Sequence, residues 1–356
     1  MAIPAPDGEL TEDCHCSTIN EIYELSVSIM YKEFPKKMKT RYVRTISILL
    51  SLLIILGLLS GCGSEQSTAG EDTIQFTDAL GRTVNLEKAP ERVAALISSF
   101  ADVWVLSGGT VCATVEDAWD DFGLELPDAV NIGGAHSPNL ELLLSANPDF
   151  VLASASTSSN VEMLEILESA GITVAYFDVD NFDDYMAMLD ICTEITGRKD
   201  LYEQNGVTLQ TQIERIKRDV AESDLSDTER TVLLLRAHSS SVKAKGSEGT
   251  ILGEMLADLG CINIADSDTS LLETLSIESI IRQEPYHIFV VTMGDNTEQA
   301  MKNLNQMMQE NPAWGMLDAV KEGRLHVMDR KLFNIKPNAR WAESYETLSK
   351  LLLGEQ

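Results

Sequence analysis

Short apolar runs alternate with amphipathic stretches along most of the chain that follows residue 72. The runs rich in β-branched residues predict strands at Val93–Ile97, Phe150–Ala153, Thr173–Phe177, Thr231–Leu235, Ile288–Thr292 and Leu325–Met328. Stretches with helical spacing predict helices at Ser159–Ala170, Asp183–Thr196, Thr250–Leu259 and Thr297–Glu310. This alternation is typical of an α/β protein with mostly parallel sheets.

The longest helical pattern runs from Lys199 to Ala221. Its apolar residues Leu209, Ile213, Ile216 and Val220 share one face of a helix. A strand-and-helix set precedes this segment and another follows it. The pattern therefore predicts two α/β lobes, at 72–198 and 223–356, joined by one long helix at 199–222.

An uncharged run from Ile46 to Leu59 stands apart from this pattern. It follows a basic stretch and ends in Leu-Ser-Gly-Cys at Cys62, which resembles the lipobox of bacterial lipoproteins. A membrane-spanning helix is the alternative, but only 17 residues separate Arg44 from Cys62, against the roughly 20 that such a helix needs. We therefore expect a signal peptide at 38–61, lipidation of Cys62, a flexible tether at 62–71 and an extracytoplasmic, lipid-anchored protein at the cell membrane.

Charge and cysteine content exclude several classes of protein. The 356 residues include 27 Lys and Arg against 56 Asp and Glu, a formal charge of −29, which argues against a nucleic-acid partner. Between Val93 and Gly197 there is no Lys or Arg at all. Cys112, Cys192 and Cys261 are widely spaced and form no metal-binding motif, so we expect small buried apolar side chains and no metal site.

Several short motifs follow one another along the chain after the lipobox. They are Asp78-Ala-Leu-Gly-Arg-Thr-Val84, Pro90-Glu-Arg-Val93, Gly133-Gly134, Asn139-Leu-Glu141, Asn147-Pro-Asp149-Phe-Val151, Leu275-Ser-Ile-Glu278 before Pro285, Asn311-Pro-Ala-Trp314, Ala319-Val-Lys-Glu-Gly-Arg324, and a closing helix with Trp341 and Tyr345. In this order and spacing the chain resembles the cobalamin and iron-siderophore substrate-binding proteins of ABC importers. The resemblance runs from Phe76 to Leu353 and departs from the family pattern at 98–102 and 106–109, in loops that lie beside the cleft in the family, so the departure leaves the fold unchanged.

The resemblance implies a monomer with a ligand cleft between two lobes that close only slightly, since one long helix resists hinging. It implies delivery of the ligand to an importer permease with its ATPase. Glu141 and Glu278 match the family's permease-docking glutamates, one on each lobe. Their alternative role is to stabilise the helices at whose starts they lie.

The same resemblance supplies candidates for the cleft. They are Trp119 and His136 on the first lobe, and Arg236, His238, Lys243, Lys331, Arg340 and Trp341 on the second. The cations would pair with an anionic ferric chelate, which is a cargo and not a resident cofactor. Because they all lie on the second lobe, a tri-catecholate is disfavoured, whereas hydroxamate or citrate-type siderophores, haem and cobalamin stay open. Haem would require an axial ligand such as His136 or His238.

Other function classes find less support in the sequence. There is no G-x-S-x-G, H-E-x-x-H or phosphate-loop motif, so no catalytic residue is proposed. A sensor that keeps this fold but feeds no transporter is the remaining alternative.

Residues 1–37 match no export signal, although they precede a complete one. Met38 begins a normal basic segment, Met-Lys-Thr-Arg. We therefore predict that translation starts at Met38 and that 1–37 result from a misassigned start site. Mass spectrometry of the source proteome tests this, and any peptide from residues 1–37 would contradict it.

Overall fold

The computed structural model describes residues 73–87, 89–294 and 296–355, which belong to one compact unit from Ala69 to Gln356. The signal peptide, Cys62, the tether and the start-site prediction lie outside the described residues. None of the helices in the described ranges is long and apolar enough to cross a membrane.

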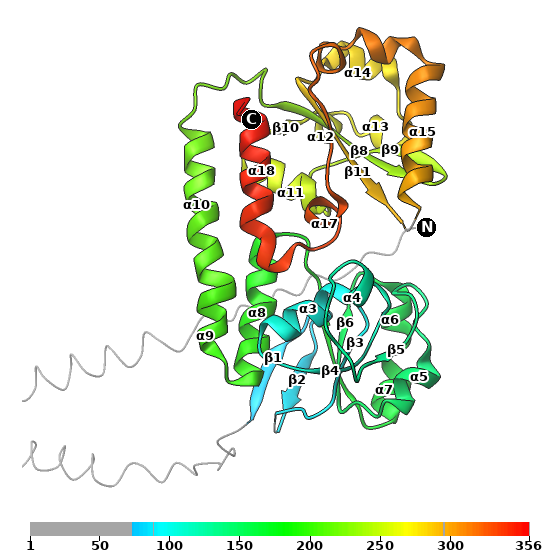
Figure 1. Cartoon of the computed structure of the whole chain (residues 1–356), viewed down its shortest axis with the longest axis vertical. Coiled ribbons are helices and arrows are strands. Elements are labelled where there is room, and N and C mark those ends of the chain that lie inside the picture. Colours follow the sequence, from blue (N-terminus) through cyan, green and yellow to red (C-terminus); the bar gives the residue numbers. More distant parts are fainter. Residues whose placement is uncertain (1–72, 88, 295, 356) are drawn as a thin grey trace, which may run out of the picture. The chain divides into compact units, whose positions relative to one another are not determined.

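Two five-stranded sheets organise the chain (Figure 1). The first has the order β5-β4-β3-β6-β7, is parallel throughout, and comprises Val130–Asn131, Val111–Thr114, Val93–Ala95, Phe150–Ser154 and Thr173–Phe177. The second has the parallel order β10-β8-β11-β12, with β9 antiparallel on β8, and comprises Ile262–Asn263, Thr231–His238, His287–Met293, Leu325–Val327 and Ser241–Lys245. The predicted α/β class with mostly parallel sheets is confirmed.

Helices surround each sheet. Those of the first lobe are α3 Ser98–Leu106, α4 Asp117–Asp120, α5 Leu140–Ser145, α6 Ser158–Glu162, α7 Leu164–Ser169 and α8 Phe182–Thr196. Those after β8 are α11 Ile251–Asp258, α12 Ile264–Ser267, α13 Ser270–Glu273, α14 Ile277–Gln283, α15 Thr297–Glu310, α16 Asp318–Lys321, α17 Arg330–Phe333 and α18 Trp341–Leu353. Because helices cover the sheets, β6 is buried at every position, which is why the parallel strands read as continuous apolar runs.

The predicted long helix is present as α9 Lys199–Tyr202, a π-helical turn Glu203–Val207 and α10 Thr208–Ala221. Its predicted apolar face is buried at Ile213, Ile216 and Val220, and α10 packs along α18. The π turn lies directly on α8, where a Cβ at Gly206 would stand 2.9 Å from the sulfur of Met186. Glycine permits this close approach.

Two features differ from the sequence prediction. The single helix expected at Ser159–Ala170 is interrupted at Met163. The Asn160 carbonyl accepts hydrogen bonds from the Tyr176 hydroxyl (2.8 Å) and from the Met163 amide three residues on (3.3 Å), in place of the α-helical bond from the fourth residue on. The antiparallel pair β1 Ile74–Thr77 and β2 Thr83–Leu86 was not predicted, nor were β4, β5, β9 and β10. Of these strands, β5 and β10 have only two residues each, too few to give a periodic signal.

Candidate ligand-binding site

A partly buried ion pair joins the segment after α4 in the first lobe to α17, which follows the second sheet. Arg330 Nη1 donates to both carboxylate oxygens of Asp121 at 2.7 Å, and the two side chains are 20% and 13% exposed. Lys331 Nζ donates to the backbone carbonyls of Asp120 (3.2 Å) and Asp121 (2.7 Å). We call Asp121, Arg330 and Lys331 the interlobe latch.

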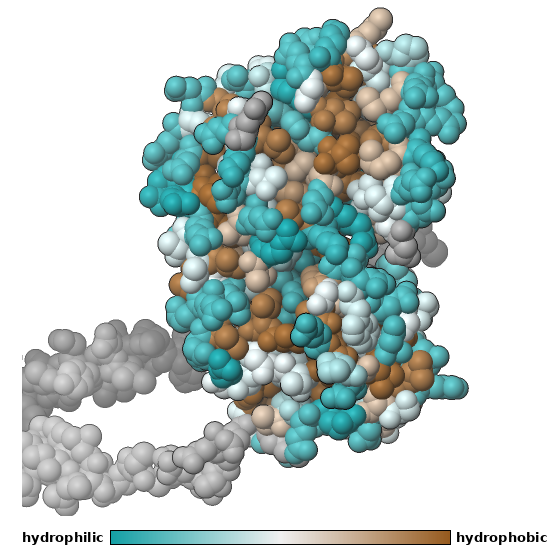
Figure 2. All heavy atoms as spheres, in the orientation of Figure 1, coloured by the Kyte–Doolittle hydropathy of each residue, from teal (hydrophilic) through white to brown (hydrophobic). Residues whose placement is uncertain are grey.

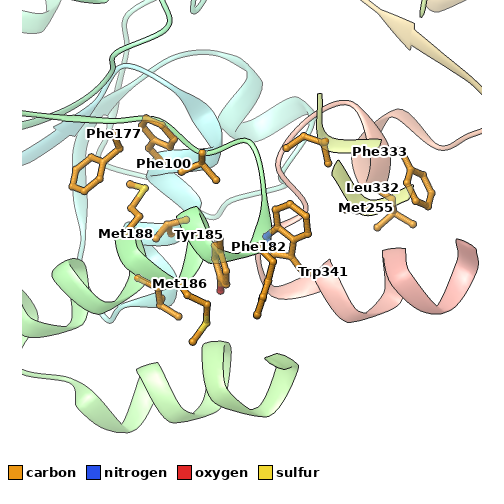
Figure 3. Packing of buried hydrophobic residues seen from close by; sticks show 14 of the residues in the cluster. Phe100, Phe177, Phe182, Tyr185, Met186, Met188, Met255, Leu332, Phe333 and Trp341 are labelled. Carbon is orange, nitrogen blue, oxygen red and sulfur yellow. The ribbon is translucent and has the colours of Figure 1, made fainter. Parts of the chain in front are cut away.

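A second set of contacts reinforces this connection. Asn338 Nδ2 donates to the Ser99 carbonyl and to Asp102 Oδ2 on α3, both at 2.8 Å. Burial raises the pKa of Asp102, and the bond from Asn338 opposes the rise. Next to Asn338, the Trp341 ring packs against Phe182 and Tyr185 of α8, with ring centroids 5.9 Å and 6.5 Å apart (Figure 3). The two lobes are thus fixed by polar and aromatic contacts as well as by the long helix.

Charged side chains from both lobes face one another near this junction. Asp180 lies between β7 and α8, and its pKa is raised by burial and then by neighbouring Asp178. Across from it, burial lowers the pKa values of Arg236 on β8 and of Lys336 in the segment before α18, while the charge of Asp180 opposes both shifts. No described carboxylate forms a direct ion pair with Arg236 or Lys336.

Two further lysines extend the positive side of this junction. Lys243 on β9 is the cross-strand partner of Arg236. Lys245 lies two residues further along β9 on the same face, and burial, then the charges of Arg236 and Lys243, lower its pKa. We call Arg236, Lys243, Lys245 and Lys336 the cation cluster.

The cation cluster has unused hydrogen-bonding capacity. The Nε atom of Arg236 is buried and has no hydrogen-bond partner among the described residues, and its Nη1 contacts only the sulfur of Met293 at 4.0 Å. Buried donors are normally satisfied, so this one is suited to an acceptor brought by a ligand. The arrangement can bind carboxylate oxygens.

The sequence-predicted ligand residues fall in different places. Arg236 and Lys243 lie in the cation cluster, and Lys331 lies in the latch. Trp119 is half-buried on α4 close to the latch, and His136 is exposed on the loop before α5. These positions leave their predicted contact with ligand untested.

Of the remaining candidates, His238 and Arg340 already have partners within the protein, and Trp341 is buried. His238 Nδ1 lies 2.9 Å from the Ser240 hydroxyl, and Arg340 forms an ion pair with Glu343. Trp341 is 0% exposed, which leaves its ring no surface for a ligand in this conformation. Its indole Nε1 is also unpartnered among the described residues.

Sequence reasoning missed Lys245, Lys336 and the facing Asp180. Lys336 belongs to a stretch rich in basic residues at 320–342. The sequence shows this charge, but it does not show that the Lys336 side chain lies near Asp180 of the other lobe. Lys245 could have been found from its alternation with Lys243, had β9 been predicted. The described residues contain no group of three His, Cys, Asp or Glu side chains that could hold a metal ion.

Both predicted docking glutamates are exposed, and each is the second residue of a short helix, Glu141 on α5 and Glu278 on α14. Within the described ranges neither carboxylate forms an ion pair or a hydrogen bond to another residue. The helices are capped in the same way, by the side chains of Asn139 and Ser276. Their docking role stays a prediction.

Two parallel-sheet lobes joined by a long helix, with unpaired cations at the junction, define a solute-binding protein. The chain belongs to the periplasmic binding protein family, whose model matches residues 93–332. This is a family of substrate-binding proteins and not an enzyme family.

Comparisons with individual proteins agree with this assignment. The chain is 26% identical to the Fe(3+)-citrate-binding protein YfmC of Bacillus subtilis, over 89% of this chain and 98% of that protein. Among solved structures it is similar to Staphylococcus aureus SirA complexed with staphyloferrin B (TM-score 0.61, 21% identity, 80% of this chain and 99% of that one). It is also similar to S. aureus IsdE complexed with heme (TM-score 0.60, 16% identity, 73% and 98%). These two structures support the fold.

The interlobe latch should contribute measurably to stability. We expect Arg330→Met to lower the free energy of unfolding by about 2 kcal/mol, because it leaves Asp121 without its partner in a largely buried position. Urea unfolding measures the change. Lys302→Met, which breaks the exposed pair with Glu298, is the matched control and should cost under about 0.5 kcal/mol. Equal losses in the two variants would show that the latch is energetically an ordinary surface pair.

Proposed function

We propose that this chain captures an iron-siderophore-type chelate outside the cytoplasmic membrane and delivers it to an ABC importer permease. The observation that carries the proposal is the cation cluster, in which Arg236 and Lys243 are cross-strand partners and the buried Nε of Arg236 has no hydrogen-bond partner among the described residues. Ferric complexes of citrate and related carboxylates present several anionic oxygens on one surface, which suits Arg and Lys donors. The ferric-citrate relative from B. subtilis and the siderophore-bound SirA structure support this choice of ligand class.

Capture needs no chemical step. The unpartnered Arg236 Nε and the three lysines would bind ligand oxygens, and ligand charge would offset the cost of keeping Arg236, Lys245 and Lys336 half-buried. Asp178 and Asp180 on the opposite lobe would repel a ligand that carried negative charge on all sides. The site therefore suits a chelate with an anionic face and a neutral or donor-bearing face.

Anchoring and delivery complete the proposal. Cys62, at the end of the predicted signal peptide, would carry the lipid that holds the protein at the extracytoplasmic membrane surface. Glu141 and Glu278 would then pair with cations of the permease, one on each lobe. Iron enters only as part of the cargo.

A titration of tryptophan fluorescence tests the ligand proposal, using the mature chain from residue 63 onwards with ferric citrate, ferric hydroxamates, haem and cobalamin. We expect saturable quenching by an anionic ferric carboxylate. Arg236→Met and Lys336→Met should each weaken it about 10- to 100-fold, because each removes a charge-assisted contact. Arg215→Met, at an exposed position on α10, is the control and should bind as the wild type does. Undiminished binding to the two cluster variants, or binding of cobalamin alone, would contradict the proposal.

Delivery is tested separately by uptake of radioactive iron chelate in cells that depend on this protein. Charge reversal at both sites, Glu141→Lys with Glu278→Lys, should abolish uptake and leave ligand affinity unchanged. Glu165→Lys with Glu248→Lys, at two exposed positions elsewhere, is the matched control. Normal uptake by the first double variant would count against the importer role and favour a sensor.

A further inference from the structure

A segment of the first lobe is repeated in the second lobe without insertion or deletion. Residues 139–154 and 276–291 align so that Asn139 corresponds to Ser276 and Pro148 to Pro285. Both segments run from a side-chain helix cap, through a short helix and a proline, into a central strand, which begins at Phe150 in one lobe and at the corresponding His287 in the other.

The backbone repeats as well as the order of elements. Asn147 (φ 50°) and Glu284 (φ 45°), at corresponding positions before the prolines, are two of the three non-glycine residues with positive φ in the described chain. Such a conformation is uncommon outside glycine, so its recurrence at one position identifies a shared local fold. Positions that match in this repeat can therefore be compared residue by residue.

The two segments share the same pattern of buried and exposed side chains at these matched positions. Leu143 and Ile280 correspond, and both are 0% exposed. The next residues, Leu144 and Ile281, also correspond, yet they are 36% and 39% exposed. Each lies three residues after a docking glutamate, which places the carboxylate and the aliphatic side chain on the same face of the helix.

Single exposed aliphatic side chains are common and need no explanation. Here the same pairing of carboxylate and aliphatic side chain occurs at the matched position of both lobes. In the second lobe Leu272, 38% exposed, lies on the preceding helix. Figure 2 shows hydrophobic side chains reaching the surface where α5 and α7 lie and where α14 lies.

The charge of this surface indicates the chemistry of its partner. From Val93 to Gly197 the first lobe has no Lys or Arg, so Glu141 has no basic residue of that stretch to pair with and is available to a cation of a partner. In the second lobe a hollow of about 570 Å³ begins beside Glu278, at Leu275 and Ile277, with Trp314 and Met307 in its wall and Glu310 among its lining residues. Both surfaces thus combine an apolar contact with an acidic one.

We infer that Leu144 and Ile281 are permease contacts, each packing against an apolar surface next to the cation that pairs with the neighbouring glutamate. The inference rests on the proposed importer function and adds to it the apolar half of each docking site. The repeat implies a permease with two similar faces, one for each lobe. Apolar contacts of this kind carry a large share of binding energy when charged pairs surround them and exclude water.

Binding of the ligand-loaded protein to its importer in lipid nanodiscs tests this, measured at low and at high salt. Leu144→Gln with Ile281→Gln, which keeps side-chain length and helix preference, should weaken binding about 10-fold at both salt concentrations. Glu141→Lys with Glu278→Lys should instead weaken it most at low salt, since salt screens charge pairs between exposed groups. Leu80→Gln with Ile262→Gln, at positions 38% and 50% exposed on the turn between β1 and β2 and on β10, is the control and should bind normally.

Ligand titration and thermal melting establish that each variant is folded, and Leu144→Ala with Ile281→Ala replaces the glutamine pair if that pair melts early. If the folded Leu144 and Ile281 variants bind normally and charge reversal abolishes binding, the inferred apolar contact is contradicted, and the importer function is not. If neither the charge-reversal nor the aliphatic variants alter binding, the docking face itself is overturned. A wild-type protein that binds ligand but no importer would overturn the proposed function together with this inference.

Discussion

The packing of Trp341 against α8 is the contact on which the arrangement of the candidate site depends. Its fully buried ring lies against Phe182 and Tyr185, at the point where the chain returns from the second sheet to the first lobe (Figure 3). The segment just before it supplies both Lys336, which faces Asp180, and Asn338, which bonds to α3. Displacing this ring would move a cation of the site and an interlobe hydrogen bond together.

Rigidity has a direct consequence for how such a protein can work. The α9–α10 helix, the latch and the Trp341 contact connect the lobes in three different ways, so a large closing motion would have to break a partly buried ion pair or an aromatic contact. Ligand recognition must then come mostly from charges that are already in position. The unpartnered Nε of Arg236 fits this view, because preformed donors lose little entropy when ligand binds.

The fold was largely predictable from the sequence, because a buried parallel strand and a long amphipathic helix both leave strong patterns. Thr173–Phe177 and Thr297–Glu310 have the predicted bounds, whereas the two-residue strands β5 and β10 leave no period to detect. The site was predictable only in part. Arg236 and Lys243 were identified from the sequence, and they are cross-strand partners in the structure. Trp341 was expected to contact ligand but is buried, because a tryptophan side chain suits a hydrophobic core as well as a binding pocket. Lys336 and Asp180 meet through tertiary structure alone, which no local pattern records.

The acidity of the chain and the cation cluster act on an anionic ligand in opposite ways. A formal charge of −29 repels an anionic chelate from most of the surface, while four cations near one junction attract it to one place. Repulsion over the remaining surface disfavours non-specific binding, and the half-buried cations are screened less by salt than exposed ones. At α5 and α14 unpaired carboxylates lie on exposed faces with aliphatic neighbours, where they would attract a cationic partner. In the proposed function, capture of an anion and docking onto a cationic partner would require opposite charges, and the fold keeps these charges apart, with one set at the lobe junction and the other on α5 and α14.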